Sequence, residues 1–161
     1  MLREQTPQDV DDLAAILSDA ATMRFYPKPF TRAQVERWIE RNLRHYSERG
    51  YGLWALILKD GGDLVGQCGL WPQHVEGRDE VELAWHVNRR LWRRGYASEA
   101  ALAARDHAFG ALGLSRLISL IRPENLPSAG VARKVGMTPE RDIIWAQRPH
   151  TMFSIEPAAL A

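Results

Sequence analysis

The stretch that decides the fold of this chain is residues 81–100, which read VELAWHVNRRLWRRGYASEA. Its first part, residues 81–87, is typical of a buried strand, and the alanine-rich residues 97–112 predict a helix. A short turn between a strand and a helix leaves backbone N–H groups unpaired at the start of the helix. The helix dipole adds partial positive charge at the same place. The stretch therefore predicts a socket for a phosphate or pyrophosphate group.

Three small residues of this turn favour close contact with an anion. Gly95 lets the backbone approach a ligand, Ala97 keeps the wall of the socket low, and Ser98 offers a hydroxyl. Four of the six residues from 89 to 94 are arginines. Because surface arginines beside a turn are often only solvated, we expect the backbone amides around Gly95 to hold the anion more firmly than the arginine side chains.

Composition and charge set limits on the class of protein. The chain has 161 residues, which suits one domain with one core. Its net charge of +1 argues against general attraction to nucleic acids or membranes. No apolar run approaches the roughly 20 residues of a membrane span, and the first residues lack a signal-peptide pattern. A cytoplasmic protein is therefore expected.

Cysteine usage excludes further classes. Cys68 is the single cysteine, so the chain has no internal disulfide framework and no cysteine-cluster metal site. It lies in an apolar, strand-like run, where it is expected to be buried as packing and not to act as a nucleophile. We expect no metal site.

Helical and strand periodicities flank the deciding stretch on both sides. Before it, the sequence predicts a strand at 2–5, a helix at 7–18, an ordered loop at 20–30, a helix at 33–48, strands at 51–59 and 64–71, and a loop at 72–79. After it, the sequence predicts a strand at 116–121, a short helix at 125–135, and one or two closing strands within 143–155, around Pro149. This order indicates a single mixed α/β domain over residues 1–161.

Taken in order, these motifs resemble the GNAT acetyltransferases. The family signature Q/R-x-x-G-x-G/A corresponds to residues 92–97, WRRGYA; ELAW at 82–85 precedes it, and NLPS at 125–128 and KVGM at 134–137 follow. Trp92 in the first signature position and the extension SEA at 98–100 are similar to the Rim-type branch, which acetylates protein N-termini and small amines. The resemblance implies a mixed, mostly antiparallel central sheet with helices on both faces and a V-shaped splay between its two central strands.

The resemblance also implies acetyl-CoA as donor substrate. Its pyrophosphate would be held by the turn residues Arg93, Arg94, Gly95, Tyr96, Ala97 and Ser98. The exposed backbone of Trp85, His86 and Val87 would pair with the pantetheine arm like an added strand. Asn125 would bind the pantetheine from the far side of the splay.

Acetylation of an amine needs a base for the amine and an acid for the departing thiolate. We favour Glu82 as the base, acting through water, with Glu80, Glu76 and His86 as competitors. A backbone amide of the strand, near His86 or Val87, would polarise the thioester carbonyl. Many GNAT relatives use a tyrosine as the acid, but residues 133–137, RKVGM, contain none. We therefore favour Ser128, whose alternative role is to cap the helix that starts there.

The sequence thus predicts an acetyl-CoA-dependent N-acetyltransferase that acts by direct transfer on a primary amine, either a peptide N-terminus or a small molecule. The alternative is a non-catalytic acyl-CoA sensor on the same fold, and a nucleotide- or nucleic-acid-binding protein is a third reading. The loop at 20–30 and the following helix would form one wall of the acceptor pocket, with Phe25, Tyr26, Phe30 and Trp38. Homodimerisation is compatible with the family.

Overall fold

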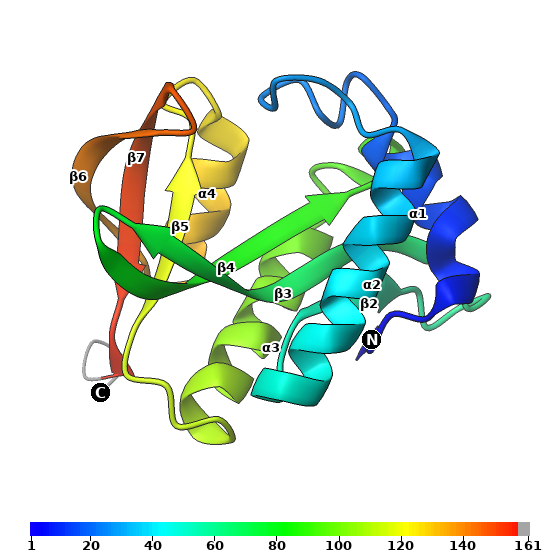
Figure 1. The fold of residues 1–161 in the computed structure, drawn as a ribbon, viewed down its shortest axis with the longest axis horizontal. Coiled ribbons are helices and arrows are strands. Elements are labelled where there is room, and N and C mark those ends of the chain that lie inside the picture. The colour runs from blue at the N-terminus through cyan, green and yellow to red at the C-terminus, as the bar shows by residue number, and fades with distance from the viewer. Residues whose placement is uncertain (158–161) are drawn as a thin grey trace.

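A computed structural model describes residues 1–157 as one mixed α/β domain built on a seven-stranded sheet (Figure 1). The strand order is β1-β2-β3-β4-β5-β7-β6, and every neighbouring pair is antiparallel except β4 and β5. The strands are β1 (Leu2–Arg3), β2 (Leu53–Ile57), β3 (Leu64–Val75), β4 (Arg78–Val87), β5 (Leu117–Ile121), β6 (Thr138–Trp145) and β7 (Arg148–Ile155). The predicted fold class is confirmed; the last four residues of the predicted domain lie outside the described part of the chain.

Helices cover both faces of this sheet (Figure 1). Helices α1 (Val10–Leu17) and α2 (Arg32–Arg49) pack together on one face, around Leu13, Ile16 and Ile39. Helices α3 (Tyr96–Gly110) and α4 (Leu126–Lys134) share the main core on the other face. Short 3-10 turns, η1 (Pro7–Asp9) and η2 (Arg89–Leu91), precede α1 and α3. All four predicted helices are confirmed. Their observed ends lie within two residues of the predicted ones, except that the first turn of the first predicted helix is the 3-10 turn η1.

The predicted loop at 72–79 is wrong. Strands β3 and β4 continue through it as one long hairpin, and they turn only at Glu76 and Gly77, both of which have positive φ. Pro72 was the signal for a loop, because proline cannot donate to a strand ladder. In the structure the nitrogen of Pro72 points away from β4, toward the side of β2. The pairing of β3 with β2 stops before Pro72, and its last hydrogen bond runs from Leu70 N to the Gly52 carbonyl. No hydrogen bond is lost there, so the strand continues.

The chain closes with two strands, β6 and β7, that pair from Thr138 to Ser154. The closing strands predicted within 143–155 are present, and β6 begins earlier than predicted, at Thr138. The turn between them consists of Ala146 and Gln147, both with positive φ, and Pro149 lies inside β7. Two successive residues with φ above zero fit the tight hairpin turns that match strand twist. Neither is a glycine, which is why the sequence pattern did not reveal the turn.

The important irregularity is the seam between β4 and β5. The two strands are parallel and pair at a single register point, Glu82 with Ile118. Beyond that point β4 continues to Val87 and β5 continues to Ile121, but the two strands no longer pair with each other. The splay predicted between the two central strands is thus present, and it opens toward the start of α3 and of α4 (Figure 1).

Candidate active site

The start of helix α3 presents a row of backbone amides. The first hydrogen bond of the helix within the described residues runs from Glu99 N to the Gly95 carbonyl, so the amides of Tyr96, Ala97 and Ser98 have no carbonyl to bond inside the helix. Gly95 caps the helix with φ of 89°, and Arg93 has φ of 61°. Arg94, between them, is not among the residues with positive φ. Such alternation of backbone conformation turns successive N–H groups to one side, which is the geometry of an anion-binding nest.

The four arginines of this region divide into two pairs. Arg89 and Arg90 line a hollow of about 210 Å³ against the end of α1, where Arg89 Nε lies 3.5 Å from Asp19 Oδ1. Arg93 and Arg94 are exposed and belong to the loop at the helix start. Trp92 closes this loop onto the sheet, because its indole N–H donates to the Val87 carbonyl at 2.8 Å. Only the second pair therefore lies beside the amide row.

The edge of β4 that faces the splay follows from alternation along the strand. Asn88 N donates to the Val65 carbonyl of β3, whereas the Leu83 carbonyl accepts a bond from β5 and the Val87 carbonyl from Trp92. Odd-numbered residues thus present their backbone groups to the splay. Trp85 and Val87 are among them, as predicted for a pantetheine edge, but the backbone of His86 faces β3.

Side chains bridge the splay near its closed end, where the backbone ladder stops. Ser119 Oγ donates to the Leu83 carbonyl at 2.6 Å, and Ser119 is buried. Leu120 N donates to Glu82 Oε1 at 3.4 Å. These two bonds hold the strands at the vertex and leave the wider part of the gap without a bond from β4 to β5 within residues 1–157.

Glu82 is placed at this vertex with its side chain on the α1–α2 face of the sheet. Gln73 Nε2 donates to Glu82 Oε2 at 2.7 Å. Burial raises the pKa of the Glu82 carboxyl, and the hydrogen bonds from Gln73 and from the Leu120 amide only partly oppose this shift. A carboxylate whose pKa is raised by burial is a stronger base than an ordinary carboxylate, which suits a general base.

The competing bases are placed elsewhere. Glu80 and Arg116 form an ion pair at the other end of the seam, Glu76 pairs with Arg141 at the β3–β4 turn, and neither carboxylate faces the splay. His86 is buried and points toward Tyr26, in the loop between α1 and α2; desolvation lowers its pKa to about 4. A histidine with that pKa is neutral at physiological pH and too weak a base to accept a proton from an amine.

Aromatic side chains form a wall beside Glu82. Trp71 is the cross-strand partner of Glu82, and Trp38 of α2 stacks on it with ring centroids 4.4 Å apart. The Arg41 guanidinium lies over both rings, at 5.5 Å from Trp38 and 5.4 Å from Trp71. Trp38, which the sequence predicts to line the acceptor pocket, is therefore brought together with Trp71. We call the group of side chains of Gln67, Trp71, Glu82 and His86, which share the α1–α2 side of β3 and β4, the acceptor face.

Helix α4 carries the remaining predicted residues on the opposite face of the sheet. Asn125 is its N-cap, with Oδ1 accepting from Ser128 N at 3.3 Å. The capping role considered for Ser128 is thus filled by Asn125, and within residues 1–157 the Ser128 hydroxyl has no hydrogen bond. Asn125 keeps its side-chain amide N–H groups for a ligand.

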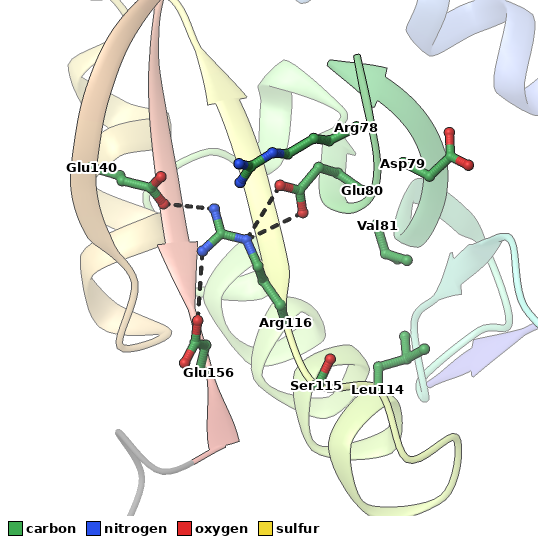
Figure 2. Close-up of a pocket in the computed structure, with 9 residues that line it drawn as sticks. All are labelled: Arg78, Asp79, Glu80, Val81, Leu114, Ser115, Arg116, Glu140 and Glu156. Carbon is green, nitrogen blue, oxygen red and sulfur yellow. Dashed lines mark hydrogen bonds and ion pairs between the residues drawn. The ribbon is translucent and has the colours of Figure 1, made fainter. Parts of the chain in front are cut away.

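Figure 2 shows the other end of the β4–β5 seam, where ion pairs connect the strands. Arg116 sits in a hollow of about 440 Å³ and meets three carboxylates: Glu80 at 3.2 Å, Glu140 at 2.6 Å and Glu156 at 3.7 Å. The four groups come from the starts of β4 and β5, from β6 and from the end of β7. They join the two halves of the sheet below the point where β4 and β5 pair.

Two negative findings complete the site. No group of three or more His, Cys, Asp or Glu side chains in residues 1–157 could hold a metal ion. No helix of the same residues is long and apolar enough to cross a membrane. Cys68 is fully buried, and burial raises the pKa of its thiol, so the expectation that it packs and does not react is consistent with its position.

Comparisons with known proteins agree with the geometry. A family model described as "Acetyltransferase (GNAT) domain" matches residues 1–138. "Uncharacterized protein YkkB" of Bacillus subtilis is 34% identical over 86% of this chain and 80% of that protein. "Uncharacterized N-acetyltransferase YnaD" of the same organism is 30% identical over 87% of this chain and 79% of that protein. An acetyltransferase structure (GNAT family) from Bacillus anthracis is 26% identical, with a TM-score of 0.80, and covers 96% of this chain and 93% of that chain.

Proposed function

The chain belongs to the GNAT acetyltransferase family and is an acyltransferase enzyme; from this premise we propose that it transfers the acetyl group of acetyl-CoA directly to a primary amine. One observation carries the proposal: β4 and β5 pair only at Glu82 and Ile118 and separate beside the unpaired amides of α3. A thioester can reach the vertex of such a gap from one face of the sheet while an amine approaches from the other.

Acetyl-CoA binding is assigned to the α3–α4 face. The amides of Arg93 to Ser98 hold the pyrophosphate, since they combine unpaired donors with the positive end of the α3 dipole. The backbone of Trp85 and Val87 pairs with the pantetheine as an added strand. Asn125 donates its side-chain amide to the pantetheine from the other wall. His86 is removed from this group, because its backbone bonds to β3 and its side chain lies on the acceptor face.

The chemistry is assigned to the vertex. Glu82 takes a proton from the attacking amine through water, and its raised pKa makes it a stronger base than an ordinary carboxylate. Of the two splay-facing amides, Trp85 N–H is nearer the vertex, so it polarises the thioester carbonyl while Val87 N–H binds the pantetheine. The nitrogen–carbon bond forms, the carbon–sulfur bond breaks, and Ser128 supplies a proton to the CoA thiolate. Ser128 is reprotonated from solvent.

The Rim-type branch remains part of the proposal and rests on Trp92 and on the SEA extension at 98–100. Members of that branch acetylate protein N-termini and small amines, so both acceptor classes are retained. Direct transfer is preferred to an acetyl-cysteine intermediate, because Cys68 is buried in β3 on the α3 face.

The test measures CoA thiol release from acetyl-CoA with a panel of a peptide N-terminus, an amino acid amide, a polyamine and an aminoglycoside. Release that depends on an amine supports the proposal. Tight acetyl-CoA binding by calorimetry without release for any amine would overturn it in favour of an acyl-CoA sensor.

A further inference from the structure

A chain of buried amide side chains crosses the acceptor face, and its direction can be derived from its ends. Leu53 N donates to Asn42 Oδ1 at 2.8 Å, so Asn42 must use its Nδ2 to donate to Gln5 Oε1, 3.0 Å away. Gln5 Nε2 in turn donates to Gln67 Oε1 at 2.8 Å. Asn42, Gln5 and Gln67 are each at most 1% exposed, so none of them can exchange a partner for bulk water.

A second donor fixes the same orientation independently. Trp38 Nε1 lies 3.1 Å from Gln67 Oε1, and an indole N–H can only donate. The Gln67 atom at that place must therefore be the oxygen. It follows that the other atom of the amide, Nε2, faces His86 Nδ1 at 3.1 Å and donates to it.

The tautomer of His86 follows from this donation. Because Nδ1 accepts a hydrogen bond it carries no proton, and a neutral imidazole then carries its proton on Nε2. Nε2 lies 2.8 Å from the Tyr26 hydroxyl, so His86 donates to Tyr26. The Tyr26 oxygen is thus used as an acceptor, and its own proton must be directed elsewhere.

The hydroxyl proton of Tyr26 has no acceptor among residues 1–157, although the hydroxyl oxygen contacts a buried side chain. The residue belongs to the loop between α1 and α2 and is 42% exposed, but its hydroxyl meets the buried His86. Burial, and to a lesser degree the Glu82 charge, raises the pKa of Tyr26, so the phenol stays protonated. Glu82 and His86 lie on one side of β4 with only Ala84 between them, so Tyr26 and Glu82 face the same space.

We propose that Tyr26 binds the amine acceptor, donating its hydroxyl proton to an oxygen carried next to the amine, and that His86 is a positioning residue that keeps this hydroxyl a donor. The proposal rests on the proposed function. Tyr26 meets His86 on the α1–α2 side of the sheet and not on the side of α3 and α4, so its partner belongs to the amine and not to CoA. The class selected is an α-amino carbonyl compound, such as an amino acid amide or a peptide N-terminus, in preference to a plain alkyl amine.

The test uses two pairs of amines that differ only in the carboxamide: leucinamide with 3-methylbutylamine, and phenylalaninamide with 2-phenylethylamine. We expect Tyr26→Phe to lower kcat/KM about five- to tenfold for each amide and less than twofold for each alkyl amine, since one neutral hydrogen bond is lost. Variant-to-wild-type ratios are compared within each amine, so differences in amine basicity cancel. His86→Leu is expected to reproduce this selective loss, and His86→Gln, which retains a donor, to restore part of it.

A second measurement does not depend on activity. Two-bond ¹H–¹⁵N spectra of the wild-type protein should show His86 neutral at pH 7, with its proton on Nε2. A proton on Nδ1 would overturn the derivation.

Equal loss of kcat/KM for amides and alkyl amines in Tyr26→Phe would also overturn the proposal, and it would indicate that Tyr26 acts on the thioester or on the fold. If the wild-type enzyme acetylates other amines but neither amide, the inference fails and the proposed function stands. If no amine causes thiol release, both fail.

Discussion

The two ends of the β4–β5 seam are built from the same strands and behave in opposite ways. Below the single register point at Glu82 and Ile118, Arg116 joins Glu80, Glu140 and Glu156 and ties both halves of the sheet together. Above it, the strands separate, and among residues 1–157 only the side chains of Ser119 and Glu82 reach across.

This difference shows how a sheet can hold a gap open at its centre. An unpaired strand edge normally attracts another strand, or a neighbour collapses onto it. Here the lower end fixes the angle between the strands, while side-chain bonds at the vertex satisfy the first backbone groups that lose ladder partners. The backbone groups of Trp85 and the N–H group of Val87 are left for a ligand, since the Val87 carbonyl is bound by Trp92. The lower end should therefore control stability and the upper end should control binding.

The largest expected effect is on acetyl-CoA affinity at the upper end. Gly95 has φ of 89°, which a β-branched residue does not adopt without strain, so Gly95→Val should move the amides of the loop. Each hydrogen bond to a charged phosphate contributes about 1.5–3 kcal/mol, so we expect affinity to fall by about 100-fold or more. Arg90→Ala, which changes a residue beside α1, should weaken binding only about threefold. Calorimetric titration with acetyl-CoA measures both.

A matched control separates strain from binding. Gly77 has φ of 81° in the β3–β4 turn, and no atom lies within 4 Å of the Cβ that a substitution would add, as at Gly95. Gly77→Val should therefore cost similar stability, about 1–3 kcal/mol, and leave acetyl-CoA affinity within twofold. A larger effect of Arg90→Ala than of Gly95→Val would refute the assignment of the pyrophosphate to backbone amides.

The next effect concerns catalysis at the vertex. Glu82→Gln should lower kcat about 100-fold, the lower range for a general base, with acetyl-CoA affinity within twofold. Because burial raises the pKa of Glu82, wild-type kcat should fall as the pH drops below that raised pKa, and the variant should lack this limb. A pH–rate profile with the same acid limb in both proteins would assign the limb to another group.

The same substitution, Glu82→Gln, should raise the thermal stability of the protein at high pH. The pKa of Glu82 is higher in the folded protein than in the unfolded chain, so folding favours the protonated carboxyl. The protonated carboxyl therefore contributes stability at low pH, and this contribution is lost as the pH rises through the folded-state pKa. Glu82→Gln removes the buried charge, and its Tm should exceed that of wild type at pH 8. The difference should shrink toward pH 4, near the usual carboxyl pKa of 4.5. Scanning calorimetry at the two pH values tests this.

The architecture and the unpaired amides at the start of α3 could be predicted because they depend on local signals. Period-2 and period-3.6 patterns, the Thr31 cap and the glycine before Tyr96 fix each element without reference to the rest of the chain. The hairpin through Pro72 could not be predicted in this way, since a proline breaks a ladder only if a strand lies on the side of its nitrogen. That depends on where β2 ends.

The acceptor face was only partly predictable for a related reason. Glu82 could be proposed as the base from its place before the signature. The tautomer of His86, in contrast, depends on Gln67, Gln5 and Trp38, which come from three distant segments. The one local signal was Gln67 itself, a large polar residue inside the apolar strand β3, which needs buried partners. Which partners it has is a property of the tertiary fold.

At the lower end, Arg116→Met should destabilise the protein by about 2 kcal/mol. The substitution leaves the Glu80 side chain, which is 11% exposed, without its countercharge. Adding Glu80→Gln to the variant should recover part of the loss, and a double-mutant cycle by urea unfolding measures the coupling. Acetyl-CoA affinity should stay within threefold; a change as large as the loss of stability would show that the two ends are not separable.

Acid sensitivity tests the same clamp. Burial would raise the pKa of Glu140, but its hydrogen bonds and the charge of Arg116 lower it overall. A carboxyl with a lowered folded-state pKa contributes stability above its unfolded value of about 4.5, and this is lost as the pH falls through the folded pKa. Glu140→Gln should therefore make the stability less dependent on pH below 4.5, as followed by unfolding at several pH values. An unchanged acid slope would place the acid sensitivity elsewhere.

The smallest effect should come from the bond that marks the boundary between the two ends. Ser119→Ala removes the hydroxyl that donates to the Leu83 carbonyl, and it leaves that carbonyl buried without this donor, at a cost of about 1 kcal/mol. Ser115→Ala, an exposed serine just before β5, is the matched control and should be neutral. Because Ser119 sets the strand separation at the vertex, the variant should also lower acetyl-CoA affinity about two- to fivefold. A loss of stability without any change in affinity would place the hinge of the splay further along β4, nearer Trp85.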